Sequence, residues 1–526
     1  MPKLLGLALC LLVLVQCTPQ VAGPPADLSL TPLPLLPTLT PLPARKDKPS
    51  VVVVTLSGAR ADYTDKLIES GAMPALARMS ALGAKAEYLQ PPDPAVAAAA
   101  QATLLTGASP ARTGIVANSF RALGQALGQS ASGFVWPPAV EPIWRSAMRY
   151  GLKAALVGYE PGTLNAAQRP DWTITLGAPV SPAVQHILKF ADAKDWKNAP
   201  VSYSPAREAR SSIAPGVDLF VLAIDSTNDQ RENYDTWLLS RAKSIDENSL
   251  PLHLDEWATL IVDPLLQSSA ALKIMDADPA HFAIYQTPVM VNQIAPVELA
   301  REITRRLGAP PAPADGDAFE RYWIDDKTYF EMAARQTQWL VSAALWLYDQ
   351  RRPDLIFLNL NGIADVSQTL WLSDPRQPGY NVDRAQTLAS TVRRAYVMTD
   401  AALATLWVQL DFNVSALLVV SDRGVAPAHT RVNLNRWLIE RKWLVLQRGT
   451  NAVDAAQSKV YAETSGGTAH LYINLKGREP GGVVELADYD KLQADVISAL
   501  AELADPADGQ PIFARVARKQ DLGALG

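Results

Sequence analysis

Three polar segments of the sequence directly follow apolar runs, and one histidine stands just before another such run. The residues concerned are Ser57, the pair Asp365 and Thr369, the pair Asp422 and Arg423, and His470. Carboxylate and imidazole groups are common ligands of zinc. An arginine instead carries a permanent charge and a planar fork of donors that suits an oxyanion. The chain has only 5 histidines, which is a small supply for a metalloenzyme.

These residues need strands that bring them to one edge of a sheet. The run 50–56 is apolar and rich in β-branched residues, which predicts a buried parallel strand. Similar runs occur at 154–158, 219–224, 355–360 and 416–421, and helical patterns occur at 329–351 and 383–409. Apolar strands that alternate with amphipathic helices predict an α/β fold with a mostly parallel sheet flanked by helices. Ligands of such sheets bind beyond the carboxyl ends of the strands.

The alternation is interrupted once. Residues 178–328 contain polar and proline-rich loops with a few short apolar runs. We therefore expect an inserted cap region at 178–328, between two parts of one α/β core at 50–177 and 329–526.

The amino-terminal segment has the pattern of an export signal. Lys3 precedes an apolar run at 4–15, which is too short to span a bilayer and is typical of a secretory signal. The run ends at Cys17 in a sequence that resembles the bacterial lipoprotein signal, although Gln16 stands where that signal has a small residue. We expect residues 1–17 to direct export and Cys17 to carry a lipid anchor at the extracytoplasmic face of the membrane. An ordinary signal peptide or an uncleaved signal anchor is the alternative.

Composition narrows the remaining classes. Residues 18–49 are rich in proline and predict a semi-rigid linker between an anchor and the folded part. Both cysteines, Cys10 and Cys17, precede that linker, so the folded part has no disulfide framework. The net charge of −5 without a basic stripe argues against a nucleic acid as the partner.

The motifs after the predicted strands resemble a known family when they are taken together. They are the segments 57–63, 94–107, 365–369 and 421–424, with further matches at 109–118 and 471–480. In this order and spacing they resemble the alkaline phosphatase superfamily, specifically its type I phosphodiesterase/nucleotide pyrophosphatase branch. The resemblance implies an alkaline phosphatase-like core in which two zinc ions flank an attacked phosphoryl group. It also implies a metal-bound Thr or Ser nucleophile and an Asn that holds phosphate oxygens.

The chain departs from that family pattern at most of the reactive positions. Ser57 stands in place of an Asp ligand, Ala97 in place of the nucleophile, and Thr369 and Arg423 in place of His ligands. The ligand positions that keep a suitable residue are Asp365, Asp422 and His470. Asn118 matches the phosphate-holding Asn.

The resemblance and its departures predict an exported, non-catalytic relative of the phosphodiesterases. We expect it to bind an anion through Asn118 and Arg423, or to bind a protein partner as a subunit of a membrane-associated assembly, with no cofactor. The alternative is a metal-dependent phosphohydrolase with one rearranged zinc site at Asp365, Thr369 and His470. A third hypothesis gives the main role to the insertion at 178–328, with the core as a platform.

Each remaining ligand also has a structural explanation. Asp365 and Asp422 could cap helices that follow their strands, because Asp is favoured at helix amino termini. His470 could be a hydrogen-bonded structural histidine, and Asn118 could hold a turn.

Overall fold

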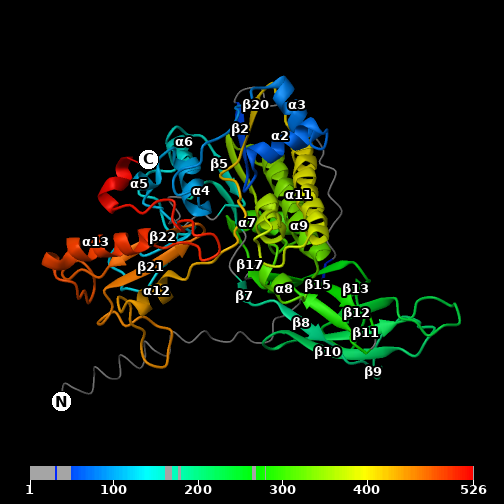
Figure 1. Cartoon of the computed structure of the whole chain (residues 1–526). Helices are drawn as coiled ribbons and strands as arrows, with labels where there is room; N and C mark the ends of the chain where they lie inside the picture. Colours follow the sequence, from blue (N-terminus) through cyan, green and yellow to red (C-terminus); the bar gives the residue numbers. More distant parts are fainter. Residues whose placement is uncertain are drawn as a thin grey trace, which may run out of the picture. The chain divides into compact units, whose positions relative to one another are not determined.

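The computed structural model describes residues 30–31, 49–159, 169–175, 179–263, 268–278 and 280–524 (Figure 1). They divide into two compact units, one of Met1–Leu33 and Ala178–Val291 and one of Pro34–Gly177 and Asn292–Gly526. The insertion predicted at 178–328 thus has its observed end at Val291, and residues 292–328 lie in the core unit. The predicted signal segment with Cys17 lies outside the described residues. Of the predicted linker 18–49, only Leu30, Thr31 and Pro49 are described.

The core unit is built on a 6-stranded sheet with the order β18-β6-β5-β19-β2-β20. Its strands are β2 (Ser50–Leu56), β5 (Ala154–Val157), β6 (Trp172–Thr175), β18 (Gln293–Ala295), β19 (Leu355–Leu360) and β20 (Ser415–Val420). Neighbouring strands run parallel except for β18, which is antiparallel to β6. The predicted α/β class with a mostly parallel sheet is therefore confirmed.

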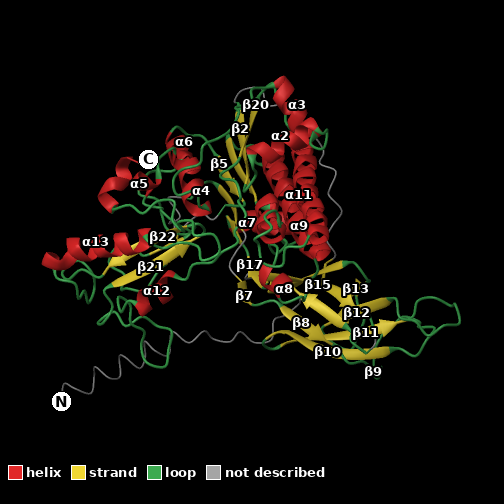
Figure 2. Ribbon diagram, in the orientation of Figure 1, coloured by secondary structure: helices red, strands yellow, loops and turns green. Residues whose placement is uncertain are grey.

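Helices flank the strands of this sheet (Figure 2). Leu105 and Trp144 pack with Val53 and Phe357 on one face. The helix predicted at 329–351 is observed as α9 (Asp326–Gln350), and the helix predicted at 383–409 is observed as α11 (Val382–Gln409). The helices of the core are α2 (Ala61–Glu69), α3 (Pro74–Leu82), α4 (Ala97–Thr106), α5 (Pro110–Thr113), α6 (Ile143–Arg149), α7 (Val297–Leu307), α8 (Gly316–Glu320), α9 (Asp326–Gln350), α10 (Gly362–Leu370) and α11 (Val382–Gln409).

The carboxyl-terminal part of the core unit forms a smaller layer of its own. It contains β21 (Val460–Ser465) paired with β22 (Thr468–Ile473), together with α12 (Leu434–Glu440) and α13 (Leu486–Ala501). Leu438 and Val460 are fully buried in its apolar core. Among the helices of the described residues, none is both long enough and apolar enough to cross a bilayer.

The other unit consists of two antiparallel sheets with a shared apolar core that includes Val221, Leu239, Leu260 and Leu272. One sheet contains β1 (Leu30–Thr31), β7 (Pro179–Ser181), β8 (Val184–Ile187), β14 (Trp257–Asp263), β15 (Ser268–Asp276), β16 (Ala283–Gln286) and β17 (Val289–Val291). The other contains β9 (Ala191–Asp192), β10 (Arg207–Ala214), β11 (Val217–Ile224), β12 (Thr236–Ser240) and β13 (Leu250–Leu252).

One predicted strand lies in a different sheet from the one expected. The run 219–224 falls in β11, which pairs antiparallel with β10 and β12 in the inserted unit. A short apolar run is equally compatible with a parallel strand and with the core of an antiparallel sandwich, so the pattern alone could not separate them.

The ends of the insertion are paired within each unit. In the core unit, Thr175 of β6 pairs with Gln293 of β18. In the inserted unit, Ser181 of β7 pairs with Val289 of β17. The chain therefore leaves and rejoins the core sheet at two adjacent strands.

Candidate functional site

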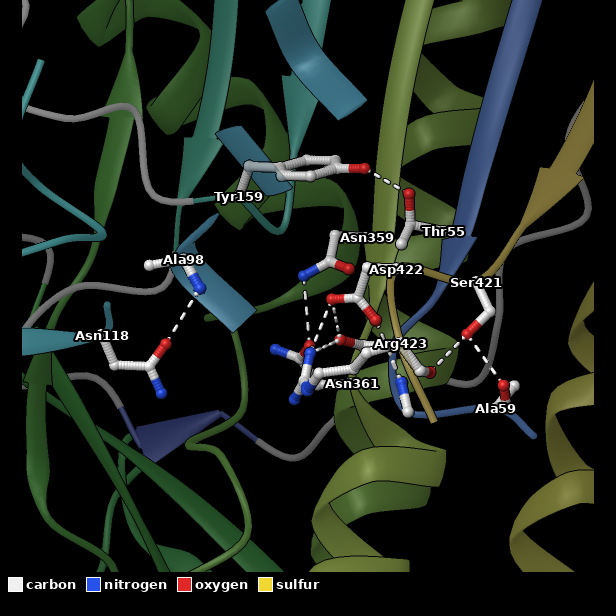
Figure 3. A network of polar contacts seen from close by, with 12 residues as sticks. Thr55, Ala59, Ala98, Asn118, Tyr159, Asn359, Asn361, Ser421, Asp422 and Arg423 are labelled. Carbon is white, nitrogen blue, oxygen red and sulfur yellow. Dashed lines mark hydrogen bonds and ion pairs between the residues drawn. The ribbon is translucent and has the colours of Figure 1, made fainter. Parts of the chain in front are cut away.

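The carboxyl edge of the parallel sheet gathers most of the predicted site residues. Leu56 pairs with Leu360, and Thr55 pairs with Val420, so β2, β19 and β20 end at the same level. Ser57 follows β2, and Asp422 with Arg423 follows β20 (Figure 3).

The Asp422 carboxylate accepts hydrogen bonds at both of its oxygens. The Ser57 hydroxyl donates to Oδ2 at 2.8 Å, and the Gly58 amide donates to Oδ1 at 3.1 Å. Arg423 Nη1 donates to Oδ2 at 2.6 Å. Asp422 is 4% exposed. Three donors, one of them charged, therefore compensate a buried carboxylate.

Arg423 uses only one edge of its guanidinium in this network. Nη1 donates to the Ser57 hydroxyl at 2.9 Å as well as to Asp422. Within the described part of the chain, Nε and Nη2 of Arg423 have no hydrogen-bond partner. The side chain is 11% exposed. A second edge of the planar fork thus has no protein acceptor among the described residues.

The turn between β2 and α2 requires a glycine. Gly58 has φ +77°, and a Cβ there would lie 2.9 Å from Ala364 of α10. An L side chain would be strained by that φ and would collide with backbone. This turn directs the Gly58 amide at Asp422. The Ser421 hydroxyl lies 2.9 Å from the carbonyl oxygen of Ala59 and 2.7 Å from that of Arg423, and its one proton is shared between these acceptors (Figure 3). This contact fixes the β20 end against the same turn.

Asp365 has a contrasting environment in the first turn of α10. Its Oδ2 is inaccessible to solvent and has no hydrogen-bond partner within the described residues. Burial raises the pKa of Asp365 to about 7, and the nearby Arg423 charge opposes that rise.

Thr369 is occupied by a neighbouring tyrosine. The Tyr329 hydroxyl of α9 donates to the Asp365 carbonyl oxygen at 3.0 Å and lies 2.8 Å from Thr369 Oγ1. Because the tyrosine proton is directed to the carbonyl, Thr369 is the donor in the second contact. Burial raises the pKa of Tyr329, so its hydroxyl stays protonated.

His470 lies on β22 and holds a loop. Its Nε2 is 3.1 Å from the carbonyl oxygen of Val116, which can only accept, so Nε2 carries the proton. Burial lowers the pKa of His470. This arrangement matches the structural explanation of His470 and directs Nε2 away from metal ligation.

The described residues do not fit a zinc centre. Among them, no group of three His, Cys, Asp or Glu side chains is placed to hold a metal ion. Both oxygens of Asp422 are already engaged, and the Arg423 guanidinium lies 2.6 Å from one of them. A dication there would have to displace a permanent positive charge. The hypothesis of one zinc at Asp365, Thr369 and His470 receives no support from the contacts of Thr369 and His470.

The predicted nucleophile position begins a helix. Ala97 is the first residue of α4 and is 8% exposed. The Asn118 side-chain oxygen accepts a hydrogen bond from the Ala98 backbone amide at 2.9 Å. The Asn118 backbone amide donates to Ser465 Oγ. Asn118 Nδ2 has no hydrogen-bond partner within the described residues. No hydrogen bond there joins Asn118 to Arg423, so a shared binding cleft stays a prediction.

Neither aspartate caps the helix after its strand. The residue before α10 is Asn361, and Asp422 accepts from the β2–α2 turn instead. Two further residues of this edge are Asn359, inside the run 355–360, and Asn361, directly after it, and neither was predicted from the sequence. Asn359 Nδ2 donates to the carbonyl of Gly158 and to Asn361 Oδ1. Tyr159, hydrogen-bonded to Thr55, was also missed (Figure 3).

A separate hollow of about 690 Å³ is formed by residues 126–129, α12 and the segment 444–455, with Tyr461 in its wall. It contains none of the residues that the sequence analysis proposed as catalytic, anion-binding or metal-binding. We place the candidate site at the sheet edge because the charged and uncompensated groups lie there.

Comparison with known proteins gives one matching family model and two similar solved structures. A family model described as type I phosphodiesterase / nucleotide pyrophosphatase matches residues 51–524. Two crystal structures of phosphonoacetate hydrolase from Sinorhizobium meliloti 1021 are similar, in complex with phosphonoformate (TM-score 0.41) and with phosphonoacetate (TM-score 0.40). Each is 14% identical, and the match covers 92% of this chain and 80% of that chain. No curated protein matches the sequence significantly.

Proposed function

The chain belongs to the type I phosphodiesterase / nucleotide pyrophosphatase family, and on that premise we propose that it binds an oxyanion at its sheet edge without hydrolysing a phosphoester. The observation that carries the proposal is the arrangement of Arg423, whose Nη1 is held by Asp422 and Ser57 while Nε and Nη2 have no partner within the described residues.

The absence of hydrolysis is argued from the lack of an attacking oxygen. Ala97 has no hydroxyl group, and the next hydroxyls of α4 are those of Thr103 and Thr106. Thr103 Oγ1 is inaccessible to solvent, and Thr106 Oγ1 donates to the Ala102 carbonyl one helical turn earlier. Phosphoryl transfer by this family's chemistry needs a positioned oxygen between two metal ions. Neither requirement is met by the described side chains.

Oxyanion binding is argued from donors that have no acceptor of their own. A guanidinium binds a phosphate or sulfate through two parallel N–H groups. The start of α4 adds the positive end of a helix dipole. Asn118 fixes the Ala98 amide and keeps Nδ2 as a further donor.

The test is calorimetric titration of the purified full chain with inorganic phosphate, sulfate and bis(p-nitrophenyl) phosphate. We expect the wild type to bind at least one of them and Arg423→Ala to bind it at least tenfold more weakly. Arg436→Ala is the matched control, since Arg436 is exposed and pairs with Glu440 on the same helix. No release of p-nitrophenol is expected with or without added zinc. Unchanged binding in Arg423→Ala, or turnover of the diester, would contradict the proposal.

We also propose export and lipid anchoring, supported by the apolar run 4–15 and by Cys17 at its end. Labelling with a radioactive fatty acid in a bacterial host should mark the wild type and not Cys17→Ser. Equal labelling of both variants would place the lipid elsewhere, and labelling of neither would favour an unlipidated signal segment.

We propose that the inserted unit is the part of the chain that binds a protein partner. Its support is the compact fold of its own at Ala178–Val291. Affinity capture with the full chain and with a variant that lacks 178–291 should lose the partner in the shorter form. Retention of the same partner by the shorter form would assign the contact to the core.

A further inference from the structure

We infer that Arg423 is the resident cation of this site: its guanidinium supplies the positive charge that Asp422 needs, and it excludes a divalent ion as long as it is present. The inference concerns the site of the proposed function, but it does not depend on whether an oxyanion binds there. It assigns to Arg423 a positioning role in the unliganded protein.

The donors and acceptors of Ser57, Asp422 and Arg423 form a closed pattern. Ser57 donates its single hydroxyl proton to Asp422 Oδ2 and accepts from Arg423 Nη1. Only a neutral hydroxyl can do both, because a carboxylate at position 57 would accept only. Ser57 and Arg423 therefore act together. Both donate hydrogen bonds to Asp422, and the three side chains have no net charge in total.

The three side chains also have little exposure to solvent. Ser57 is 0% exposed, Asp422 is 4% exposed, and Arg423 is 11% exposed at its side chain. A carboxylate in such a place must be paired, because an isolated buried charge is very costly. Arg423 is the cation in contact with Asp422. Removal of Arg423 alone would leave the charge of Asp422 with two neutral donors.

Removal of Arg423 would also change the surroundings of Asp365. Asp365 Oδ2 is already without a hydrogen-bond partner within the described residues. Arg423 is close enough to act on Asp365 electrostatically. Without the guanidinium, two carboxylates would share one site edge without the cation that now acts on both of them, which is a condition that attracts a divalent ion.

The experiment is a double-mutant cycle on the full chain with Asp422→Asn, Arg423→Gln and the combined variant, followed by thermal unfolding in EDTA. We expect Arg423→Gln to lower the midpoint by about 5–10 °C, since an uncompensated buried charge is strongly destabilising. The combined variant should lose clearly less than the sum of the two single variants. Strict additivity would overturn the inference. If Arg423→Gln does not fold, folding of the combined variant supports the inference, and failure of the combined variant overturns it.

The second measurement is titration of each EDTA-treated, dialysed protein with zinc chloride. We expect Arg423→Gln to bind Zn²⁺ at least tenfold more tightly than the wild type and than the combined variant. Arg423→Lys keeps the charge and should match the wild type. Equal zinc affinity of Arg423→Gln and the wild type would overturn the exclusion, as would wild-type stability that falls on chelation.

The two proposals can fail separately. Wild-type protein that binds no oxyanion, together with a non-additive cycle, refutes the proposed function and keeps the resident cation. Oxyanion binding with an additive cycle and an unchanged zinc affinity refutes the resident cation alone.

Discussion

The two retained carboxylates stand at the same sheet edge and have opposite surroundings. Asp422 accepts from Ser57, Gly58 and Arg423, so both of its oxygens are satisfied. Asp365 keeps one inaccessible oxygen without a partner within the described residues, and its pKa is raised to about 7. The family pattern assigns both positions to metal binding, yet only one of them is compensated by the protein itself.

The difference shows that a site without the family's metal ligands can still compensate the charge of one carboxylate through its own side chains. At Asp422 the replaced neighbours, Ser57 and Arg423, are donors directed at the carboxylate. At Asp365 the replaced neighbour, Thr369, contacts Tyr329 instead. Ser57 and Arg423 compensate the charge of Asp422, whereas Asp365 keeps a half-buried carboxyl whose raised pKa favours the protonated form.

The largest expected effect is at the compensated carboxylate. Asp422→Ala should lower the free energy of unfolding by about 3–5 kcal/mol, because it leaves Arg423 without its counter-ion and Ser57 without its acceptor. Urea unfolding followed by circular dichroism measures the change. Asp374→Ala is the control, since Asp374 pairs with the exposed Arg376 and should cost much less than Asp422→Ala. Equal losses in the two variants would remove the distinction between the carboxylates.

The next effect depends on pH and has the opposite sign. The carboxyl of Asp365 has a pKa of about 7 in the folded chain against 3.8 in its ordinary state. Between these values the folded state binds more protons than the unfolded state, so stability falls as pH rises through about 7. Asp365→Asn removes this loss and should stabilise the chain by about 1–3 kcal/mol at pH 8.

The pH profile provides the control for that prediction. At pH 4 the wild type is already protonated at Asp365, so Asp365→Asn should have a near-zero effect there. Urea unfolding at pH 4, 6 and 8 measures the profile. A gain that is the same at every pH, or a loss at pH 8, would show that Asp365 is compensated like Asp422.

A smaller effect is expected at Tyr329. Tyr329→Phe removes the donor to the Asp365 carbonyl and the partner of Thr369, which should cost about 1 kcal/mol of unfolding free energy. Tyr63→Phe is the matched control, since the Tyr63 ring packs against Trp371 in a tilted arrangement and its hydroxyl has no partner within the described residues. A larger loss in Tyr63→Phe than in Tyr329→Phe would contradict the role given to Tyr329.

The smallest expected effect is on catalysis. Ala97→Ser restores an oxygen at the family's nucleophile position and should give no measurable hydrolysis of bis(p-nitrophenyl) phosphate, with or without zinc. The reason is that neither carboxylate has the partner ligands of a metal site. Zinc-dependent turnover by Ala97→Ser would show that the metal positions can still function.

The parallel sheet could be predicted because its strands are continuous apolar runs such as 50–56 and 355–360. The gathering of Ser57, Asp422 and Arg423 followed from their places after neighbouring strands. The saturation of Asp422 could not be predicted, because it depends on the turn at Gly58 and on the rotamer of Arg423. The engagement of Thr369 depends on Tyr329, a residue of another helix whose hydroxyl leaves no pattern in the sequence.

The strand pairs at the insertion junction have a mechanical consequence for the core. Thr175 and Gln293 are held as neighbours by the sheet itself, so the chain enters and leaves the segment 178–291 at two adjacent strands of the core. The entropy of closing a loop grows slowly with its length. Replacement of 178–291 by a short turn between these two strands should therefore leave the edge that holds Arg423 as it is.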